Sequence, residues 1–345
     1  MKYSTISFPG FGIGEFTVDN VAFEIFGVSI AWYALIITCG MIGAVVYATL
    51  MAKKIGMSFD DVIDFALWTI PIGVLGARLY YVLTTLDEIG YDTFFDVINI
   101  RGGGLAIYGG IIAGAITVLV VSYIKKINFL AFADCVAPGV LFAQGVGRWG
   151  NFMNGEAFGA QTDWFCRMGL KNINTFRDFG TSELVYVHPT FLYESLWNFL
   201  GFALVNLYAK FFGKKYDGQL FIMIFGWYGL GRMLIEGLRT DSLYIPGTEL
   251  RASQVLAAVI FVICTALLIY FAIKRPTKEL YYKPANAVVS GKGKSLKSDN
   301  YLDKVMQSKP VVALKQKWND IFGKSDSGRA SSDKKNDKNK KKGKK

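Results

Sequence analysis

The sequence predicts an all-α polytopic membrane protein with seven transmembrane helices, small outer-face elements, an N-terminus outside the cell and a C-terminus in the cytoplasm. Three observations predict this fold. The 345 residues are 52% hydrophobic and 19% charged, with a mean hydropathy of +0.32, which is typical of polytopic membrane proteins. Seven apolar runs are long enough to cross a bilayer. Lys and Arg gather in alternate loops between these runs.

A helix needs about 20 mostly apolar residues to cross the hydrocarbon core of a bilayer. Several runs contain Gly, Pro or a charge, so we expect the helices to pack against one another. The first 20 residues lack the basic segment of a cleavable signal, and the first run is therefore interpreted as a retained span. The predicted spans cover approximately residues 29–51, 62–84, 103–124, 129–150, 189–211, 218–237 and 252–273.

The orientation follows from the distribution of basic residues, because Lys and Arg are retained in cytoplasmic loops. The loops between the other runs are acidic or balanced. Every basic loop therefore falls on one side, which predicts the cytoplasmic side. The basic residues that follow the first, third, fifth and seventh runs are Lys53, Lys54, Lys125, Lys126, Lys210, Lys214, Lys215, Lys274 and Arg275.

The formal net charge of +11 comes from the C-terminal part, because residues 276–345 hold 19 Lys/Arg and 7 Asp/Glu. The sequence therefore predicts a transmembrane catalytic domain at 1–275 and a basic, disordered cytoplasmic tail at 276–345. Apolar residues at helical spacing in the tail suit either a helix on the anionic inner leaflet or a solvated segment with no specific role. These residues are Val311, Leu314, Trp318, Ile321 and Phe322.

Unusual polar residues gather near the outer ends of the predicted spans. An arginine at the centre of a membrane helix costs about 2.5–3.5 kcal/mol, against a gain of about 0.5 for a leucine. Such residues need a carboxylate partner, a water-filled cavity or an anionic ligand. The candidates are Tyr33, Arg78, Tyr108, Arg148, Asn151, Asn154, His188, Tyr228, Arg232, Glu236 and Arg239.

Four of these candidates follow one another at i, i+4, i+8 and i+11, which places Tyr228, Arg232, Glu236 and Arg239 on one helical face. They suit either an ion-pair ladder that fixes packing or part of an anion site. Together with the other arginines, their positive charge exceeds what Glu236 and Glu156 neutralise. An anion is therefore expected, and phosphate suits guanidinium groups.

Three other titratable residues are interpreted as non-catalytic. His188, the one histidine, could act as a base, but a hydrogen bond at the start of a helix is the favoured interpretation. Asp64 and Asp134 fall in the inner halves of their spans and are expected to be structural or interfacial rather than catalytic. The four cysteines lack metal-site spacing, and the sequence has no P-loop, HExxH or GxSxG motif.

The stretch from Gly147 to Gly159 carries seven fixed positions: Gly147, Arg148, Asn151, Phe152, Asn154, Glu156 and Gly159. It resembles the signature of the bacterial prolipoprotein diacylglyceryl transferase family. Three more stretches resemble the same family over residues 20–273: Trp32-Tyr33, the segment from His188 to Glu194, and the segment from Tyr228 to Asp241.

The resemblance implies a seven-helix enzyme of the bacterial cytoplasmic membrane with its active site near the outer leaflet. Its reaction would transfer the diacylglyceryl group from phosphatidylglycerol to the lipobox cysteine of a preprolipoprotein, as the first step of lipoprotein maturation. The partners would be phosphatidylglycerol, the signal-peptide and lipobox region and membrane lipids. Neither a cofactor, a metal nor a nucleic acid is expected.

By the same resemblance, Arg148 and Arg232 would be essential, and the site would be lined by Tyr33, Asn151, Glu156, Tyr228, Glu236 and Arg239. One position departs from the family, because many members carry histidine where this chain has Tyr108. Tyrosine, with a pKa near 10, is a poor base at neutral pH. The candidate proton acceptors are Tyr108 assisted by an arginine, Glu236, Glu156, or no dedicated group.

Two other classes of protein use buried arginines. A transporter or lipid-binding channel would place its site near the membrane midplane and show repeated halves, whereas here the polar layer is off-centre and no internal repeat is found. A scaffold of ion-paired helices would not need the surplus of arginine. The enzyme is therefore the favoured interpretation.

Overall fold

The computed structural model describes residues 3–274 apart from 88, 92, 101–102, 241–243 and 246. All of the described residues fall in the first of the chain's two units, Met1–Val289. The predicted domain boundary at 275/276 and the predicted tail, including its apolar segment at 311–322, lie outside the described residues.

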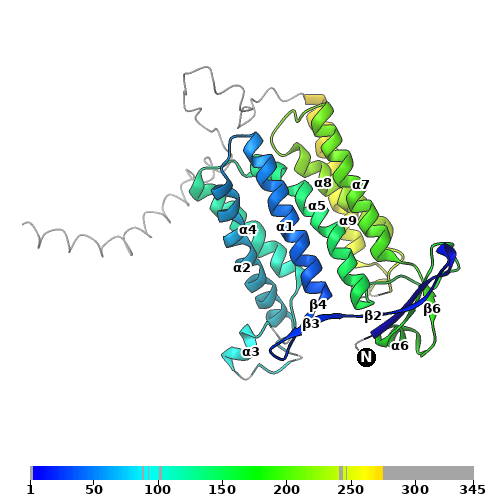
Figure 1. The fold of residues 1–345 in the computed structure, drawn as a ribbon. Helices are drawn as coiled ribbons and strands as arrows, with labels where there is room; N and C mark the ends of the chain where they lie inside the picture. The colour runs from blue at the N-terminus through cyan, green and yellow to red at the C-terminus, as the bar shows by residue number, and fades with distance from the viewer. Residues whose placement is uncertain are drawn as a thin grey trace, which may run out of the picture. The chain divides into compact units, whose positions relative to one another are not determined.

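Long helices form at all seven predicted spans (Figure 1). Five of them are long and apolar enough to cross a membrane, which supports a polytopic membrane protein. The helices at the fifth and sixth predicted spans do not reach that standard. The seven are α1 (Trp32–Lys54), α2 (Phe59–Thr84), α4 (Ile107–Lys125), α5 (Phe129–Asn154), α7 (Thr190–Phe211), α8 (Gln219–Glu236) and α9 (Ala252–Lys274).

The two helices that fall short, α7 and α8, carry polar residues that are turned into the protein. Glu194 and Asn198 of α7 are buried, as are Gln219 and Glu236 of α8. These side chains lower the mean hydropathy of the helices but do not face the surroundings. Burial of polar residues against protein rather than lipid is the arrangement expected of functional polar residues in membrane proteins.

Strands and short helices form at one end of the bundle, where α1 and α7 begin and where α5 and α8 end; we call this the polar end. The strands at the N-terminus were not predicted. These elements are β1 (Tyr3–Phe8), η1 (Pro9–Phe11), β2 (Ile13–Asp19), β3 (Val21–Ile25), β4 (Val28–Ala31), α3 (Phe94–Ile98), β5 (Met168–Lys171), α6 (Ile173–Phe179) and β6 (Val185–Val187).

Four of the strands form an antiparallel sheet in the order β2-β1-β5-β6, and β3 pairs with β4 in a separate hairpin. The short strand β6 lies next to β5, with Met168 opposite Val187. Ile6, Leu170 and Val187 are fully buried and pack with Phe191 of α7. This small core attaches the sheet to the first turn of α7.

Two boundaries differ from the predicted ones. Residues 28–31 form β4, so the first long helix begins at Trp32 rather than near 29. The third begins at Ile107 rather than 103, because Gly103 and Gly104 adopt φ values of 83° and 72°. This left-handed backbone is unfavourable for residues with a side chain and ends regular helix.

The helices pack in pairs: α1 against α5, α2 against α4, and α8 against α9 (Figure 1). The α2–α4 pair approaches closely at Gly76 and Gly109. A Cβ atom on Gly76 would overlap Ala113 and lie 2.8 Å from the Gly109 carbonyl oxygen. These glycines therefore serve close packing of helices, as small residues do in membrane proteins.

Helices α7 and α8 are joined by a reciprocal pair of tryptophans. Trp197 and Trp227 stack with their ring centroids 4.4 Å apart. Each indole donates to the other's backbone carbonyl, over 3.0 Å from Trp197 and 2.9 Å from Trp227. Gly201 and Gly231 provide the room, since a Cβ atom on either would overlap one of the indoles.

At the opposite end of the bundle, Asp134 has the structural role expected of it. Its carboxylate accepts hydrogen bonds from the backbone N–H groups of Gly218 (2.8 Å) and Phe221 (2.9 Å). Lys214 lies 3.2 Å from the same carboxylate. Asp134 of α5 thus caps the first turn of α8, where an acidic group is favourable. Asp64 of α2 pairs with Lys125 of α4 at 2.5 Å.

We predict that Gly76→Ala destabilises the protein by roughly 1–3 kcal/mol, because the added methyl group overpacks the α2–α4 contact. The matched control is Gly73→Ala on the same helix, where a Cβ atom would lie 3.6 Å from the Gly110 carbonyl oxygen, an ordinary contact. Thermal unfolding in detergent measures both variants. Equal melting temperatures for the two would contradict the close approach.

Candidate active site

Three arginines meet one carboxylate at the polar end of the bundle. Glu194, in the second turn of α7, lies 2.5 Å from Arg148 of α5, 3.1 Å from Arg232 of α8 and 3.0 Å from Arg239. The Glu194 side chain is only 6% exposed. A carboxylate buried to this degree is stable only when it is paired, and here it joins three segments that are distant in the sequence.

A second, smaller network follows α5 to its end. Arg148 Nη1 donates to Asn151 Oδ1 over 3.3 Å, and Asn151 Nδ2 donates to Glu156 Oε1 over 3.0 Å. Asn154 Nδ2 donates to the same Glu156 oxygen, also over 3.0 Å. The two carboxamides therefore fix Glu156 beside the arginine, and the signature residues form one connected network.

The predicted ladder on α8 exists only in part. Arg232 pairs with Glu236 at 2.7 Å, as the i, i+4 spacing predicts. However, α8 ends at Glu236, so Arg239 does not share its helical face. The chain turns at Gly237 and brings Arg239 to Glu194 instead. Arg251 donates a short hydrogen bond to the Glu236 carbonyl oxygen.

Three glycines of the signature region hold this network in place. Gly155 caps α5 with a φ of 59°, and its carbonyl oxygen accepts from Asn172 Nδ2 over 2.7 Å. Gly159 bridges to Arg239, and its N–H donates to the His188 carbonyl oxygen over 2.9 Å. Gly150 leaves room for the Tyr33 ring, which a Cβ atom would meet at 2.8 Å.

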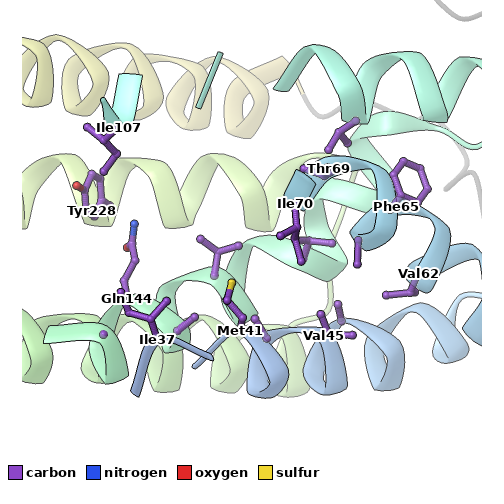
Figure 2. A pocket seen from close by; sticks show the side chains of 18 of the residues that line it. Ile37, Met41, Val45, Val62, Phe65, Thr69, Ile70, Ile107, Gln144 and Tyr228 are labelled. Atoms are coloured by element: carbon purple, nitrogen blue, oxygen red, sulfur yellow. The ribbon is translucent and has the colours of Figure 1, made fainter. Parts of the chain in front are cut away.

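A long hollow of about 520 Å³ lies between the α1–α5 pair and the α2–α4 pair. Figure 2 shows its lining side chains, from Tyr228 and Ile107 at one end to Phe65 and Val62 at the other. Apart from Thr69 of α2, its polar lining residues gather toward the polar end: Tyr33, Gln144, Arg148, Asn151 and Tyr228. The rest of its wall is almost entirely aliphatic or aromatic. We call this cavity the lipid hollow, because its wall is polar toward one end and apolar along the rest of its length.

A smaller hollow of about 220 Å³ lies on the other side of Asn151. Its wall is mainly polar and is formed by the end of α5, by α6 and by the chain after α8. It is lined by Asn151, Glu156, Ala157, Phe158, Asn174, Arg177, Asp178, Arg239 and Thr240. We call it the polar hollow. Asn151 borders both cavities, so one carboxamide stands between an apolar and a polar compartment.

Two predicted site residues lie apart from this network. The Arg78 guanidinium donates to the carbonyl oxygens of Asp96 (2.6 Å), Val97 (2.8 Å), Gly103 (2.8 Å) and Gly104 (3.1 Å). These hydrogen bonds attach the segment between α2 and α4 to the end of α2. Tyr108 follows Ile107 at the start of α4 but borders neither the lipid hollow nor the polar hollow.

His188 lies at the edge of the site, directly before α7. Its Nδ1 atom is 3.3 Å from the Tyr193 hydroxyl, and its backbone N–H donates to the Ala160 carbonyl oxygen over 3.0 Å. Burial lowers the pKa of the imidazole below its usual value, so the ring is neutral at neutral pH. These contacts agree with the hydrogen-bonding role favoured from the sequence. Asp241, the last residue of the third similar stretch, lies outside the described residues.

The residue that the sequence reasoning missed is Glu194. The expected surplus of positive charge was counted against Glu236 and Glu156 alone, and Glu194 supplies a further buried negative charge. The signal was present, since Glu194 lies in the stretch from His188 that resembles the family. It lies six residues after that histidine, in the second turn of α7, so both are at the polar end.

The fold and the site define a polytopic membrane protein that encloses an amphipathic hollow with an arginine–carboxylate network at its polar end. The model of the prolipoprotein diacylglyceryl transferase family matches residues 20–270. The chain belongs to this family.

Curated relatives carry the same name. The phosphatidylglycerol–prolipoprotein diacylglyceryl transferase of Clostridioides difficile is 42% identical over 244 residues, 70% of this chain and 91% of the relative. Transferase 1 of Clostridium perfringens is 40% identical over 268 residues, 76% of this chain and 99% of the relative. The Enterococcus faecalis transferase is 42% identical over 255 residues, 73% and 90% of the two chains.

We predict that Glu194→Gln destabilises the protein by about 3–5 kcal/mol, because three guanidinium groups lose the buried counter-charge that they share. Glu183→Gln is the matched control, since Glu183 is an exposed carboxylate at the same end and its change should stay within about 0.5 kcal/mol. Thermal unfolding in detergent compares the two. A Glu194→Gln variant as stable as the control would refute the structural role of this carboxylate.

Proposed function

We propose that this protein transfers the diacylglyceryl group of phosphatidylglycerol to the lipobox cysteine of a preprolipoprotein and releases glycerol phosphate. The observation that carries the proposal is the lipid hollow, whose apolar wall meets Arg148 at its polar end. A glycerophospholipid has the same division, with acyl chains at one end and an anionic phosphate at the other. Guanidinium groups suit that phosphate in charge and in geometry.

In this reaction, the cysteine thiolate attacks the glycerol carbon that carries the phosphodiester, and the carbon–oxygen bond to phosphate breaks. Negative charge develops on the departing phosphate oxygen. We assign the stabilisation of this charge to Arg148, which borders the lipid hollow, and to Arg232, which is held beside it through Glu194. Donors fixed before the reaction stabilise such charge without reorganising.

The thiol must lose its proton, because the thiolate is the nucleophile. We assign this proton to Glu156, which borders the polar hollow and is held by Asn151 and Asn154. Glu236 is 1% exposed and paired with Arg232, so we assign it the orientation of that arginine. Tyr108 borders neither hollow and receives no role in proton transfer.

The remaining site residues are assigned roles according to where each one lies. Tyr33 and Tyr228 border the lipid hollow and are assigned to the glycerol backbone of the lipid. Arg239 borders the polar hollow, which is the natural place for the leaving glycerol phosphate and for the polar part of the peptide. His188 packs edge-on against Trp164, with ring centroids 5.4 Å apart, and supports the wall of the site.

For the membrane arrangement, we propose seven spans with the polar end at the outer leaflet of the bacterial cytoplasmic membrane and the C-terminus in the cytoplasm. The basic residues in the last turns of α1, α4, α7 and α9 support this orientation. It suits both substrates, since phosphatidylglycerol is a membrane lipid and an exported preprotein presents its cysteine just outside its apolar signal helix.

We predict that Arg148→Ala and Arg232→Ala each lower turnover by roughly 100–1,000-fold, because each removes a donor to the developing charge. The measurement uses purified protein, phosphatidylglycerol and a lipobox peptide, and it follows thioether product and free glycerol phosphate. Lys171→Ala removes an exposed basic residue of β5 and serves as the control. Normal thioether formation by both arginine variants would refute the assignment, and binding without product would indicate a transporter or channel.

We predict that a membrane-impermeant thiol reagent labels intact cells at Glu183→Cys but labels Lys53→Cys only after lysis. Both changes are made in a variant whose native cysteines are replaced by serine. Glu183 lies at the polar end, and Lys53 lies in the last turn of α1 at the opposite end. The reverse labelling pattern would show that the proposed orientation is wrong.

A further inference from the structure

We propose that the apolar end of the lipid hollow selects phosphatidylglycerol by acyl-chain length. The selecting surface, which we call the floor, consists of Ala48 of α1, Val62 and Phe65 of α2, and Phe132 of α5. This inference rests on the proposed function, because it assumes that a diacylglycerol-based lipid occupies the hollow. It adds a specificity that neither the family nor the arginine network implies.

The two ends of the hollow are separated by a fixed length of helix. Tyr33 borders its polar end and Ala48 borders its floor, both on α1. Fifteen residues of helix correspond to about 22 Å at 1.5 Å per residue. One leaflet contributes only about 15 Å, half of the hydrocarbon core. A chain seated from the polar end would therefore reach beyond the midplane of the bilayer, inside the protein.

The floor is part of a packed core rather than a soft boundary. Phe65 and Phe132 stack with ring centroids 3.7 Å apart and an interplanar angle of 19°. All four floor residues are buried, and Val121 and Ile127 pack in the same cluster. Because interiors packed to this density resist added volume, the floor cannot yield to extra methylene groups without strain.

The polar end is fixed as well. Arg148 borders the hollow and is held at 2.5 Å by the buried Glu194. With the phosphate held at one end and the floor rigid at the other, the chain between them has one available length. A longer chain would have to bend or leave the hollow, and a shorter chain would leave part of it empty.

Small residues widen part of the wall above the floor. Ala44 of α1 and Ala66 of α2 border the hollow between its two ends. Hydrophobic transfer alone cannot select chain length, since the bilayer is as apolar as the hollow. Selection therefore depends on the shape of the floor, and a change of volume there should change the preferred length.

The test measures kcat/KM of the purified full-length protein with dioctanoyl, dimyristoyl and distearoyl phosphatidylglycerol and a lipobox peptide. Mixed micelles remove any effect of bilayer thickness. We expect Ala48→Phe to lower kcat/KM for the distearoyl lipid by roughly tenfold or more, as overpacking requires. The same variant should lower kcat/KM for the dioctanoyl lipid by a smaller factor, because the shorter chain does not reach the floor, so the distearoyl-to-dioctanoyl ratio should fall.

Phe65→Ala is the opposite change, since it deepens the floor and should raise the distearoyl-to-dioctanoyl ratio. It also tests the role of the floor if Ala48→Phe does not fold, which thermal unfolding would reveal. Val46→Phe is the matched control, because Val46 is 53% exposed on the other face of α1 and does not border the hollow. Its chain-length profile should equal that of the wild type.

Three outcomes would overturn the proposal: a flat wild-type profile, an equal loss with all lipids in Ala48→Phe, or a shifted profile in Val46→Phe. A wild-type protein that forms no thioether with any of the lipids would instead refute the proposed function. The failure of the chain-length selection and the failure of the activity are therefore distinguishable in one assay.

Discussion

The structure depends on one buried carboxylate that three guanidinium groups share. Glu194 is contributed by α7, while its partners come from α5, α8 and the chain after α8. Each charge alone would be costly to bury, and together they are stable only in one arrangement. The carboxylate therefore sets where α5, α7 and α8 meet, and the same contacts aim Arg148 at the lipid hollow and Arg239 at the polar hollow.

The two cavities follow from how the helices pair. Helix α2 packs mainly on α4 and α1 mainly on α5, and the two pairs meet through the cluster of Ala48, Phe65 and Phe132 at the opposite end. The space between the pairs remains unfilled toward the polar end. The sheet β2-β1-β5-β6 lies elsewhere at the polar end, where its core packs against the first turn of α7.

Much of this could be predicted from the sequence. The lengths of the apolar runs predicted the positions of all seven helices. The energetic cost of burying arginine indicated that Arg148 and Arg232 converge. The N-terminal strands were missed although β1 pairs with the adjacent β2, and β3 with β4. Only the pairing of β1 with β5, more than 150 residues away, leaves no local pattern. The role of Glu194 depends on three distant partners, and the bonding of Arg78 depends on backbone carbonyls, which carry no side-chain signal.

Some errors arose from treating regular structure as continuous. The α8 face was extended to Arg239, although a turn at Gly237 intervenes. The helix at the third span was extended to Gly103, although left-handed glycines precede it. Gly237 follows the last residue of α8, and two left-handed glycines precede α4 by a few residues. The residues beyond these glycines are positioned by contacts that the spacing does not encode.

The position of Asn151 on the boundary of both cavities has a kinetic consequence. A protein with two separate cavities does not have to empty one before filling the other. Under the proposed function, both reactants are present at the same time, one on each side of a single amide. Group transfer can then take place directly within a ternary assembly, and no covalent carrier on the protein is required.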